Sequence, residues 1–588
     1  MRHALKAAAF VGIGFSLASF ATEPGFSPAL LAALDPSRAA QSLCGAGRPR
    51  SAFARDLLIA AAAAAPAGQA SPIPLYSDLV DSPFPVTTPN QQARRYFSQG
   101  LLLTYGFNHS GAVRSFREAQ RLDPDCALCW WGEAVALGPN INAPMDDRDR
   151  TAALAMDRAM ALRDRASPLE RALIEAVARR YSRDPKADRA ALDAAYADAM
   201  LEVASRFPAD DDVAVLAVEA VMDTTPWNYW EADKKTPVGR SGEAVRLVEA
   251  VLARNPAHLQ AEHLYIHLLE VSDPQRAEAA ADRLSRQASH SAGHLVHMPA
   301  HIYYRLGRYA DSIRVNIAAA RSDEAFIQGA DDHNLVRYGY YPHNVHFIVA
   351  SAQMAGDMST AIREAQRLRT ILDPETSARI AWIQAIDAAP YLAMAQFADP
   401  DAILAMPAPD ARLPYAVAMR HYARAVAYAE RRDRAGFNAE LGEIAALRTS
   451  DALAGMIAQG VPAADLLSLA EAVARGRFAA AQGQYSEAAE FYRQAITFEG
   501  RIPYQEPPYW YYPVRQSLGA VMFLAGRYDE ASQAFRDALV QSPNNGWVLY
   551  GLARSEEAQG HQLEAAAAKQ ALANAWLGDD RWLRMERL

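Results

Sequence analysis

A period of roughly 34 residues recurs along this chain from about residue 92. Each unit carries a turn of the form Leu-Gly-x-Tyr, followed by an alanine, an aromatic residue, a second alanine and a proline. Clear examples run from Gly106 to Pro124, from Leu306 to Tyr309, from Gly483 to Tyr492 and from Gly526 to Ala538. Small residues at these places allow two helices to approach closely, and the aromatic side chain fills the gap to the next unit. The period therefore predicts stacked helix pairs.

This pattern resembles the tetratricopeptide repeat. The resemblance implies an all-α solenoid, a right-handed superhelix of antiparallel helix pairs, with about eleven or twelve pairs in this chain. Hydrophobic residues make up 51% of the sequence, and alanine is abundant whereas glycine and β-branched clusters are sparse. A single array can contain all 588 residues because each unit packs mainly on its neighbours.

The repeats divide the chain into unequal sections. We expect a signal peptide at 1–21, with a second signal-like segment reaching about residue 70, a low-order region at 22–91, repeats with aromatic insertions at 92–256, histidine-rich repeats at 257–372 and further repeats at 373–588.

The amino terminus has the pattern of a secretory signal. An apolar run from Ala7 to Phe20 follows the basic MRHALK, and Ser19 and Ala21 are spaced for cleavage. An uncleaved membrane anchor is the alternative, but the run is short for a bilayer span of about 20 residues. The sequence predicts a periplasmic or secreted protein with no membrane span after cleavage.

Cys126 and Cys129 form a CxxC pair, and Cys44 is the third cysteine. In an oxidising compartment an even pair predicts a disulfide. Redox exchange or metal binding is the alternative, but no thioredoxin-like pattern surrounds the pair and no second CxxC accompanies it.

Charge and motifs exclude several classes of function. The formal charge of −9, from 68 acidic and 59 basic side chains, gives no electrostatic footprint for nucleic acid or an anionic membrane. The sequence has no glycine-rich phosphate loop, nucleophile elbow or HExxH motif.

Ten of the fourteen histidines lie between His258 and His346, and their spacing follows the repeat. One histidine stands ten residues before the turn in three consecutive units, and two of these have a second histidine four residues later on the same helix face. Because a buried imidazole without a partner costs free energy, this arrangement favours metal ligands over packing. The predicted ligands are His263, His267, His297, His301 and His346.

Nitrogen donors without thiolate suit a transition metal. We expect copper first, with iron or zinc as the alternatives. The resemblance to tetratricopeptide repeats implies that these side chains line the concave groove. Additional ligands or groove residues are expected at His343, His294, His109, Glu262 and Asp332, and Glu270 is the candidate for proton transfer.

Four long connections interrupt the period, and three of them are rich in aromatic residues. Long loops in a tight repeat are often functional. Packing of these loops against the solenoid wall is an equally weighted alternative. The predicted substrate pocket contains Trp227, Trp230, Tyr304 and Tyr341, and the loop RIPYQEPPYWYYP after Gly500 has the same aromatic character.

Phrases such as HMPAHIY, together with YYPHNVHF, are similar to segments of a group of secreted bacterial tetratricopeptide proteins. The resemblance covers roughly Gln92 to Arg367. It brings no catalytic residues, so the roles above follow from the residues themselves.

Three functions are consistent with these features. The first is a metal-dependent enzyme for oxidation or hydrolysis, acting on a small molecule or peptide in the groove. The second is a scaffold that binds peptides or proteins, as most tetratricopeptide proteins do, and a pH-sensitive or acidic ligand would suit the same groove. The third is metal storage or delivery. The oligomeric state is left open by the sequence.

Overall fold

The computed structural model describes residues 73–79, 82–142, 149–184, 187–288, 290–332 and 335–588. The predicted signal peptide at 1–21 and the second signal-like segment lie outside these residues. Over the described part the chain is predominantly helical, and an isolated β bridge pairs Trp230 with Pro237.

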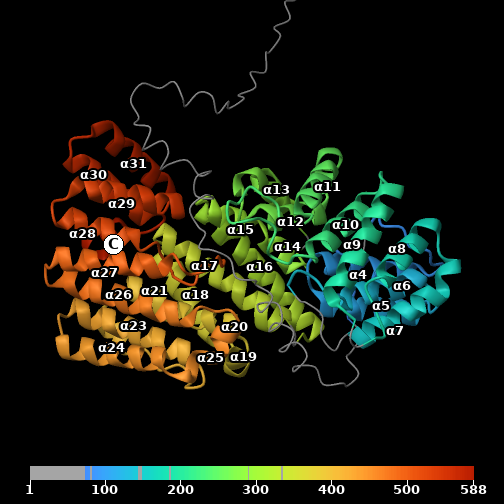
Figure 1. Cartoon of the computed structure of the whole chain (residues 1–588), viewed down its shortest axis with the longest axis horizontal. Coiled ribbons are helices and arrows are strands. Elements are labelled where there is room, and N and C mark those ends of the chain that lie inside the picture. Colours follow the sequence, from blue (N-terminus) through green and yellow to red (C-terminus); the bar gives the residue numbers. More distant parts are fainter. Residues whose placement is uncertain (1–72, 80–81, 143–148, 185–186, 289, 333–334) are drawn as a thin grey trace, which may run out of the picture.

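Blue to green ribbons at one end of Figure 1 form the first section of the array. Its elements are α4 (Gln91–Tyr105), α5 (His109–Leu122), α6 (Ala127–Leu137), α7 (Asp149–Leu162), η2 (Arg163–Arg165), α8 (Pro168–Ala178), α9 (Arg189–Arg206), α10 (Asp211–Met222) and α11 (Ser241–Arg254). Side chains cap several of these helices, as Asn90 does by accepting hydrogen bonds from the backbone N–H groups of Gln92 and Ala93.

The middle section carries most of the histidines. Its elements are α12 (Leu259–Leu269), α13 (Pro274–Gln287), α14 (Gly293–His297), α15 (Pro299–Arg305), α16 (Tyr309–Ala330), the π-helical turn η3 (Val336–Tyr340), α17 (Tyr341–Ala355) and α18 (Met358–Ile371).

Orange and red ribbons form the last section (Figure 1). Its elements are α19 (Pro374–Arg379), α20 (Ala381–Ile386), α21 (Ala389–Phe397), α22 (Pro400–Leu404), α23 (Pro414–Glu430), α24 (Arg434–Thr449), η4 (Asp451–Leu453), α25 (Ala454–Ala458), α26 (Ala463–Ala481), α27 (Tyr485–Glu499), α28 (Arg515–Leu524), α29 (Tyr528–Gln541), α30 (Gly546–Ala558), α31 (Gln562–Ala575), η5 (Asp580–Trp582) and η6 (Met585–Arg587).

Neighbouring helices pack in pairs, such as α4 with α5, α12 with α13 and α30 with α31. The repeat residues explain how closely they pack. Phe116 of α5 lies between Gly100 and Gly132, where an added Cβ would come within 2.7 Å and 2.3 Å of its ring. Phe535 lies in the same way between Gly519 and Gly551. This packing confirms the prediction of an all-α tetratricopeptide-repeat solenoid.

The array also folds back on itself, which a simple solenoid does not require. The indole Nε1 of Trp547 donates to the carbonyl of Gln353 at 2.8 Å. The backbone N–H of Leu577 donates to the carbonyl of Ala355 at 2.9 Å. These contacts attach α30 and the end of α31 to α17, so the loop between α27 and α28 comes close to the histidine-rich helices.

Within the region 22–91, for which the sequence predicts little regular structure, the described residues 73–79 and 82–90 contain no helix or strand, and α4 begins at Gln91. They pack against the first helices. Ile73 and Phe84 are buried, and the hydroxyl of Tyr96 donates to the carbonyl of Ile73 at 3.2 Å.

Among the described residues, no single helix has the length and apolar composition needed to cross a membrane. One bent pair, Asp451–Ala458 with Ala463–Ala481, passes that test only when its two parts are taken together.

Candidate metal centre

Six histidines from four helices form one layer inside the array, which we call the histidine layer. Adjacent rings within it have centroids 4.8 to 6.1 Å apart. Its members are His263 and His267 on α12, His294 and His297 on α14, His301 on α15 and His343 on α17. The layer divides into two groups of three, in each of which one nitrogen per ring lies within 4.8 Å of the others.

The first group consists of His263, His267 and His294, whose exposed fractions are 0%, 2% and 7%. Both ring nitrogens of His294, Nε2 of His267 and Nε2 of His263 are buried and have no hydrogen-bond partner among the described residues, whereas Nδ1 of His267 faces Glu270. A buried polar atom without a partner costs about 1–3 kcal/mol. Four such atoms in one group require an explanation.

Burial lowers the pKa of His263 and of His294 well below the usual value, and the neighbouring imidazoles lower it further. Burial also lowers the pKa of His267, although Glu270 opposes this shift. All three imidazoles are therefore neutral at pH 7, and a neutral imidazole has the lone pair that a metal ion needs.

A side-chain amide orients His263. Nδ1 of His263 lies 3.0 Å from Oε1 of Gln260, and Nε2 of Gln260 donates to Glu219 at 3.2 Å. Because the amide nitrogen is used by Glu219, its oxygen faces the ring and accepts the proton of Nδ1. The lone pair of the neutral ring is then on Nε2 of His263, and an oriented imidazole of this kind is common around metal ligands.

Aromatic side chains surround the first group. The ring of Phe107 lies 4.7 Å from His263, 5.8 Å from His267 and 5.1 Å from His294, measured between centroids. Trp227 lies 5.0 Å from His267, and Tyr340 lies 4.9 Å from His294. These rings separate the group from solvent.

The second group consists of His297, His301 and His343, and His343 is partly exposed. Nδ1 of His297 lies 2.6 Å from Oδ1 of Asn316, whose Nδ2 donates to the carbonyl of Ser312 at 2.8 Å. The amide is therefore fixed with its oxygen toward the ring, as at Gln260. Nε2 of His297 lies 2.9 Å from Nε2 of His301.

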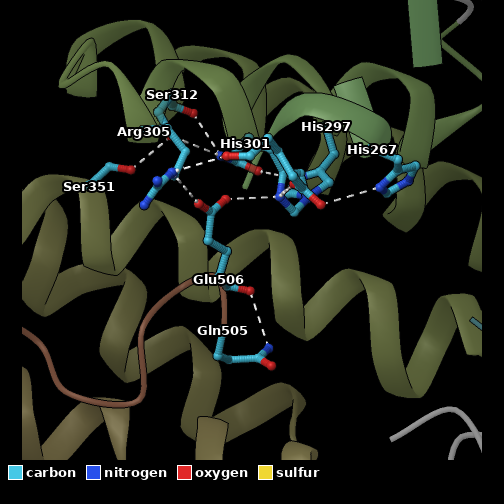
Figure 2. A network of polar contacts seen from close by, with 10 residues as sticks. His267, His297, His301, Arg305, Ser312, Ser351, Gln505 and Glu506 are labelled. Atoms are coloured by element: carbon cyan, nitrogen blue, oxygen red, sulfur yellow. Dashed lines mark hydrogen bonds and ion pairs between the residues drawn. The ribbon is translucent and has the colours of Figure 1, made fainter. Parts of the chain in front are cut away.

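Two carboxylates contact the other ring nitrogen of His301, and Figure 2 shows that of Glu506. Its Nδ1 lies 2.7 Å from Oε2 of Glu270 and 3.0 Å from Oε2 of Glu506. Glu506 comes from the loop between α27 and α28, and Nε of Arg305 lies 3.6 Å from its other oxygen. Glu270 also reaches the first group, since Oε1 lies 3.5 Å from Nδ1 of His267.

The protonation states of Glu270, His301 and Glu506 depend on one another because the three side chains are in contact. Burial alone would raise the pKa of Glu270, but His301 and His267 hold it below the usual value. Burial alone would lower the pKa of His301, but the two carboxylates raise it to about 10. Burial raises the pKa of Glu506. In the absence of an ion, His301 therefore holds a proton next to an ionised Glu270.

Four of the five predicted ligands belong to the histidine layer, and His346 does not. It lies one turn beyond His343 on α17, and burial lowers its pKa to about 4. The structure brings His294 and His343 into the groups, both of which the sequence suggested as additional ligands. Glu270 lies between the two groups.

Several predicted residues contact other parts of the molecule. Glu262 accepts from Arg283 at 2.8 Å, on the side of α12 that faces α13. Asp332 accepts from Ser110 at 3.1 Å. Tyr341 donates to Glu324 at 2.6 Å.

The other predicted pocket residues lie nearer the layer. Trp227 contacts His267, whereas the indole Nε1 of Trp230 donates to the carbonyl of Leu268. Tyr304 is buried against Phe347, which also contacts His301.

His109 stacks on Phe107. It lines a small cavity whose wall also includes Arg180 and Glu219. It therefore lies one aromatic ring away from the first group. Cys126 and Cys129 are joined by a disulfide, and Cys126 caps the start of α6.

Sequence reasoning missed most of the residues that orient and enclose the layer. Gln260, Asn316, Phe107 and Glu506 carried no repeat signal of their own. Two aromatic-rich connections gave a signal: the stretch from Ser322 to Pro342, which contains Tyr340, and the loop after Gly500, although the carboxylate of that loop is what contacts the layer.

No protein-family model matches the chain, and no curated protein matches it. Among solved structures, it is similar to the human IFIT1 dimer with m7Gppp-AAAA, at 10% identity and a TM-score of 0.30, covering 91% of this chain and 99% of that one. The APC/C hetero-tetramer Cut9-Hcn1 matches at 13% identity and a TM-score of 0.25, covering 83% and 96%.

Proposed function

We propose that the protein binds a transition-metal ion through His263, His267 and His294, and that it is a metal-dependent enzyme for oxidation or hydrolysis of a small molecule. Copper is the favoured ion, with iron or zinc as the alternatives.

The observation that carries the proposal is the state of the buried ring nitrogens. His294 is the clearest case, because neither of its nitrogens has a hydrogen-bond partner among the described residues and its exposed fraction is 7%. Packing alone would favour an apolar side chain at this place. A metal ion supplies the missing partner for three rings at once, and their lowered pKa values keep them available as donors.

The surroundings favour catalysis by a bound ion over a peptide groove. Three histidine ligands leave a coordination position open, as in catalytic zinc sites. Glu270 is a buried carboxylate beside the group and is able to hold or transfer a proton. His263 is fully buried behind Phe107, so a peptide lying in the groove would not touch it.

The metal content of the full-length chain tests the proposal. We would compare wild type with His294→Leu, using His290→Leu as the matched control, because His290 is exposed and belongs to neither group. Elemental analysis after growth with copper, zinc and iron measures the bound ion. Thermal unfolding of the metal-free proteins provides a second readout.

We expect near-stoichiometric metal in wild type and in His290→Leu, and a loss of about one equivalent in His294→Leu. The metal-free His294→Leu protein should be at least as stable as wild type, because the substitution removes unpaired polar atoms. A wild-type protein that retains no metal and binds none when titrated would overturn the proposal. An unstable His294→Leu protein that keeps its metal would show a packing role.

Export to the periplasm or outside the cell is part of the proposal and is supported by the pattern of residues 1–21 and by the disulfide between Cys126 and Cys129. The mass of the mature amino terminus, isolated from the periplasmic fraction of the expressing cell, tests it. An intact Met1 in a cytoplasmic product would contradict it.

A further inference from the structure

The second group brings two ring nitrogens, Nε2 of His297 and Nε2 of His301, to within hydrogen-bond distance of each other. Nδ1 of His297 donates to the oxygen of Asn316, because the amide nitrogen is already used by Ser312. Nδ1 of His301 faces the oxygens of Glu270 and Glu506. In its neutral form, each ring would therefore carry its lone pair on Nε2.

The two Nε2 atoms face each other across 2.9 Å. Two lone pairs at this distance would repel, so one positive charge lies between them: either the proton that His301 holds in the absence of an ion, or a metal ion that replaces it. In tetrahedral coordination with metal–nitrogen bonds of about 2.0–2.1 Å, two ligand nitrogens lie roughly 3.3 Å apart. The observed separation needs only a small movement to fit an ion, and His343 supplies a third nitrogen.

The two groups are close enough to form one centre. Ring centroids of His294 and His297 are 6.0 Å apart, and those of His267 and His301 are 6.1 Å apart. Glu270 is fully buried between the groups and reaches one histidine from each. A carboxylate in this place partly balances two positive ions.

We infer that the histidine layer is a two-ion centre, with a second transition-metal ion bound by His297, His301 and His343 beside the ion of the first group. This inference rests on the proposed function, since the first ion is the one proposed above. The second ion takes the same class of nitrogen donors, with Glu270 and Glu506 orienting His301 and offsetting the charge.

The experiment counts ions and measures their proximity. Metal-free full-length protein is titrated with Cu²⁺ and followed by native mass spectrometry and by electron paramagnetic resonance. The variants are His343→Leu, which removes a ligand of the second group, and His294→Leu, which removes one of the first. His346→Leu is the matched control, because it lies one turn away on α17 and outside both groups.

We expect two equivalents in wild type and in His346→Leu, one in either single variant and none in the double variant. Two ions in adjacent groups also couple magnetically, so the spectrum of the doubly loaded protein should broaden relative to either single variant.

If wild type binds only one equivalent and His343→Leu binds the same amount, the inference of a second ion would be wrong. A proton would then occupy the space between His297 and His301. Two equivalents without magnetic coupling would overturn the inference as well, because the second ion would then lie elsewhere. If wild type binds no metal ion at all, the proposed function itself would be wrong.

Discussion

Oε2 of Glu506 lies 3.0 Å from Nδ1 of His301, although 205 residues separate them in sequence. The contact exists because α30 and the end of α31 attach to α17 and carry the loop before α28 to the middle of the array. The histidines of the layer come from neighbouring repeats, but a distant repeat supplies Glu506, which a simple solenoid would not bring to this place.

Glu506→Gln should weaken metal binding at the second group. The amide keeps the shape of the side chain but removes the negative charge that orients and stabilises His301. Loss of such a partner usually reduces metal affinity 10- to 100-fold. Competition with a chelator of known affinity measures the change. Glu499→Gln is the control, because Glu499 is partly buried at the same connection but accepts from the backbone N–H of Val514. Equal affinity in Glu506→Gln and wild type would contradict a role in ion binding.

Gln260→Met and Asn316→Leu should affect the two ions separately. Each substitution removes the oxygen that accepts the Nδ1 proton of one repeat-equivalent histidine, His263 or His297. We expect a drop of about 10- to 100-fold in affinity for the first ion in one variant and for the second in the other. Metal titration by calorimetry resolves the two steps. Gln384→Met, at a buried amide in α20, should leave both affinities unchanged.

Gly307→Ala should destabilise the fold-back contact. Gly307 has a φ of +72°, and an added Cβ would lie 2.1 Å from the carbonyl oxygen of Pro543. Gly526→Ala is the control, because Gly526 has a φ of +76° in an equivalent turn but open space around it. The control should cost about 1–2 kcal/mol from backbone strain. Gly307→Ala should cost roughly 1–3 kcal/mol more in the free energy of unfolding, since backbone atoms must move. Equal losses in denaturant unfolding would show that the fold-back contact contributes nothing.

Asp387→Asn should change how stability depends on pH. Burial raises the pKa of Asp387 from 3.8 to about 7, so the folded state holds its proton more tightly than the unfolded state. Stability from this group is present at low pH and is lost as the pH rises toward 7. The variant should therefore gain stability over wild type between pH 4 and 7, by up to about 4 kcal/mol, and the gain should be constant above pH 7.5.

Unfolding in urea at several pH values measures this difference. Asp410→Asn is the control, because hydrogen bonds from Arg412 lower the pKa of Asp410 to about 2, below the range tested. A pH-independent difference between Asp387→Asn and wild type would show that Asp387 is ionised in the folded protein.

The repeat period predicted the fold because its small and aromatic residues act between neighbouring helices. It also placed His263, His267, His297 and His301 on one face, since the spacing within a helix fixes which side chains share a face. The assignment of His346 depended on finer geometry. His343 and His346 point about 60° apart on α17, so the rotation of that helix decides which of them reaches the group.

The orienting and enclosing residues required knowledge of contacts between distant segments. Gln260 and Asn316 are ordinary polar residues in sequence, and only the positions of Glu219 and Ser312 show which way their amides face. The contact of Glu506 with His301 depends on the fold-back of the last repeats, and no local sequence pattern predicts that fold-back.

Because Glu506 lies far along the chain from the histidines, it is synthesised well after them. During synthesis, helices α12 to α17 leave the ribosome long before the loop that carries Glu506, and early segments begin to fold first. A nascent chain therefore has the imidazoles of the layer without one of the two carboxylates that contact His301. The complete centre, with both carboxylates in place, is available to a metal ion only when the last repeats have been made and folded.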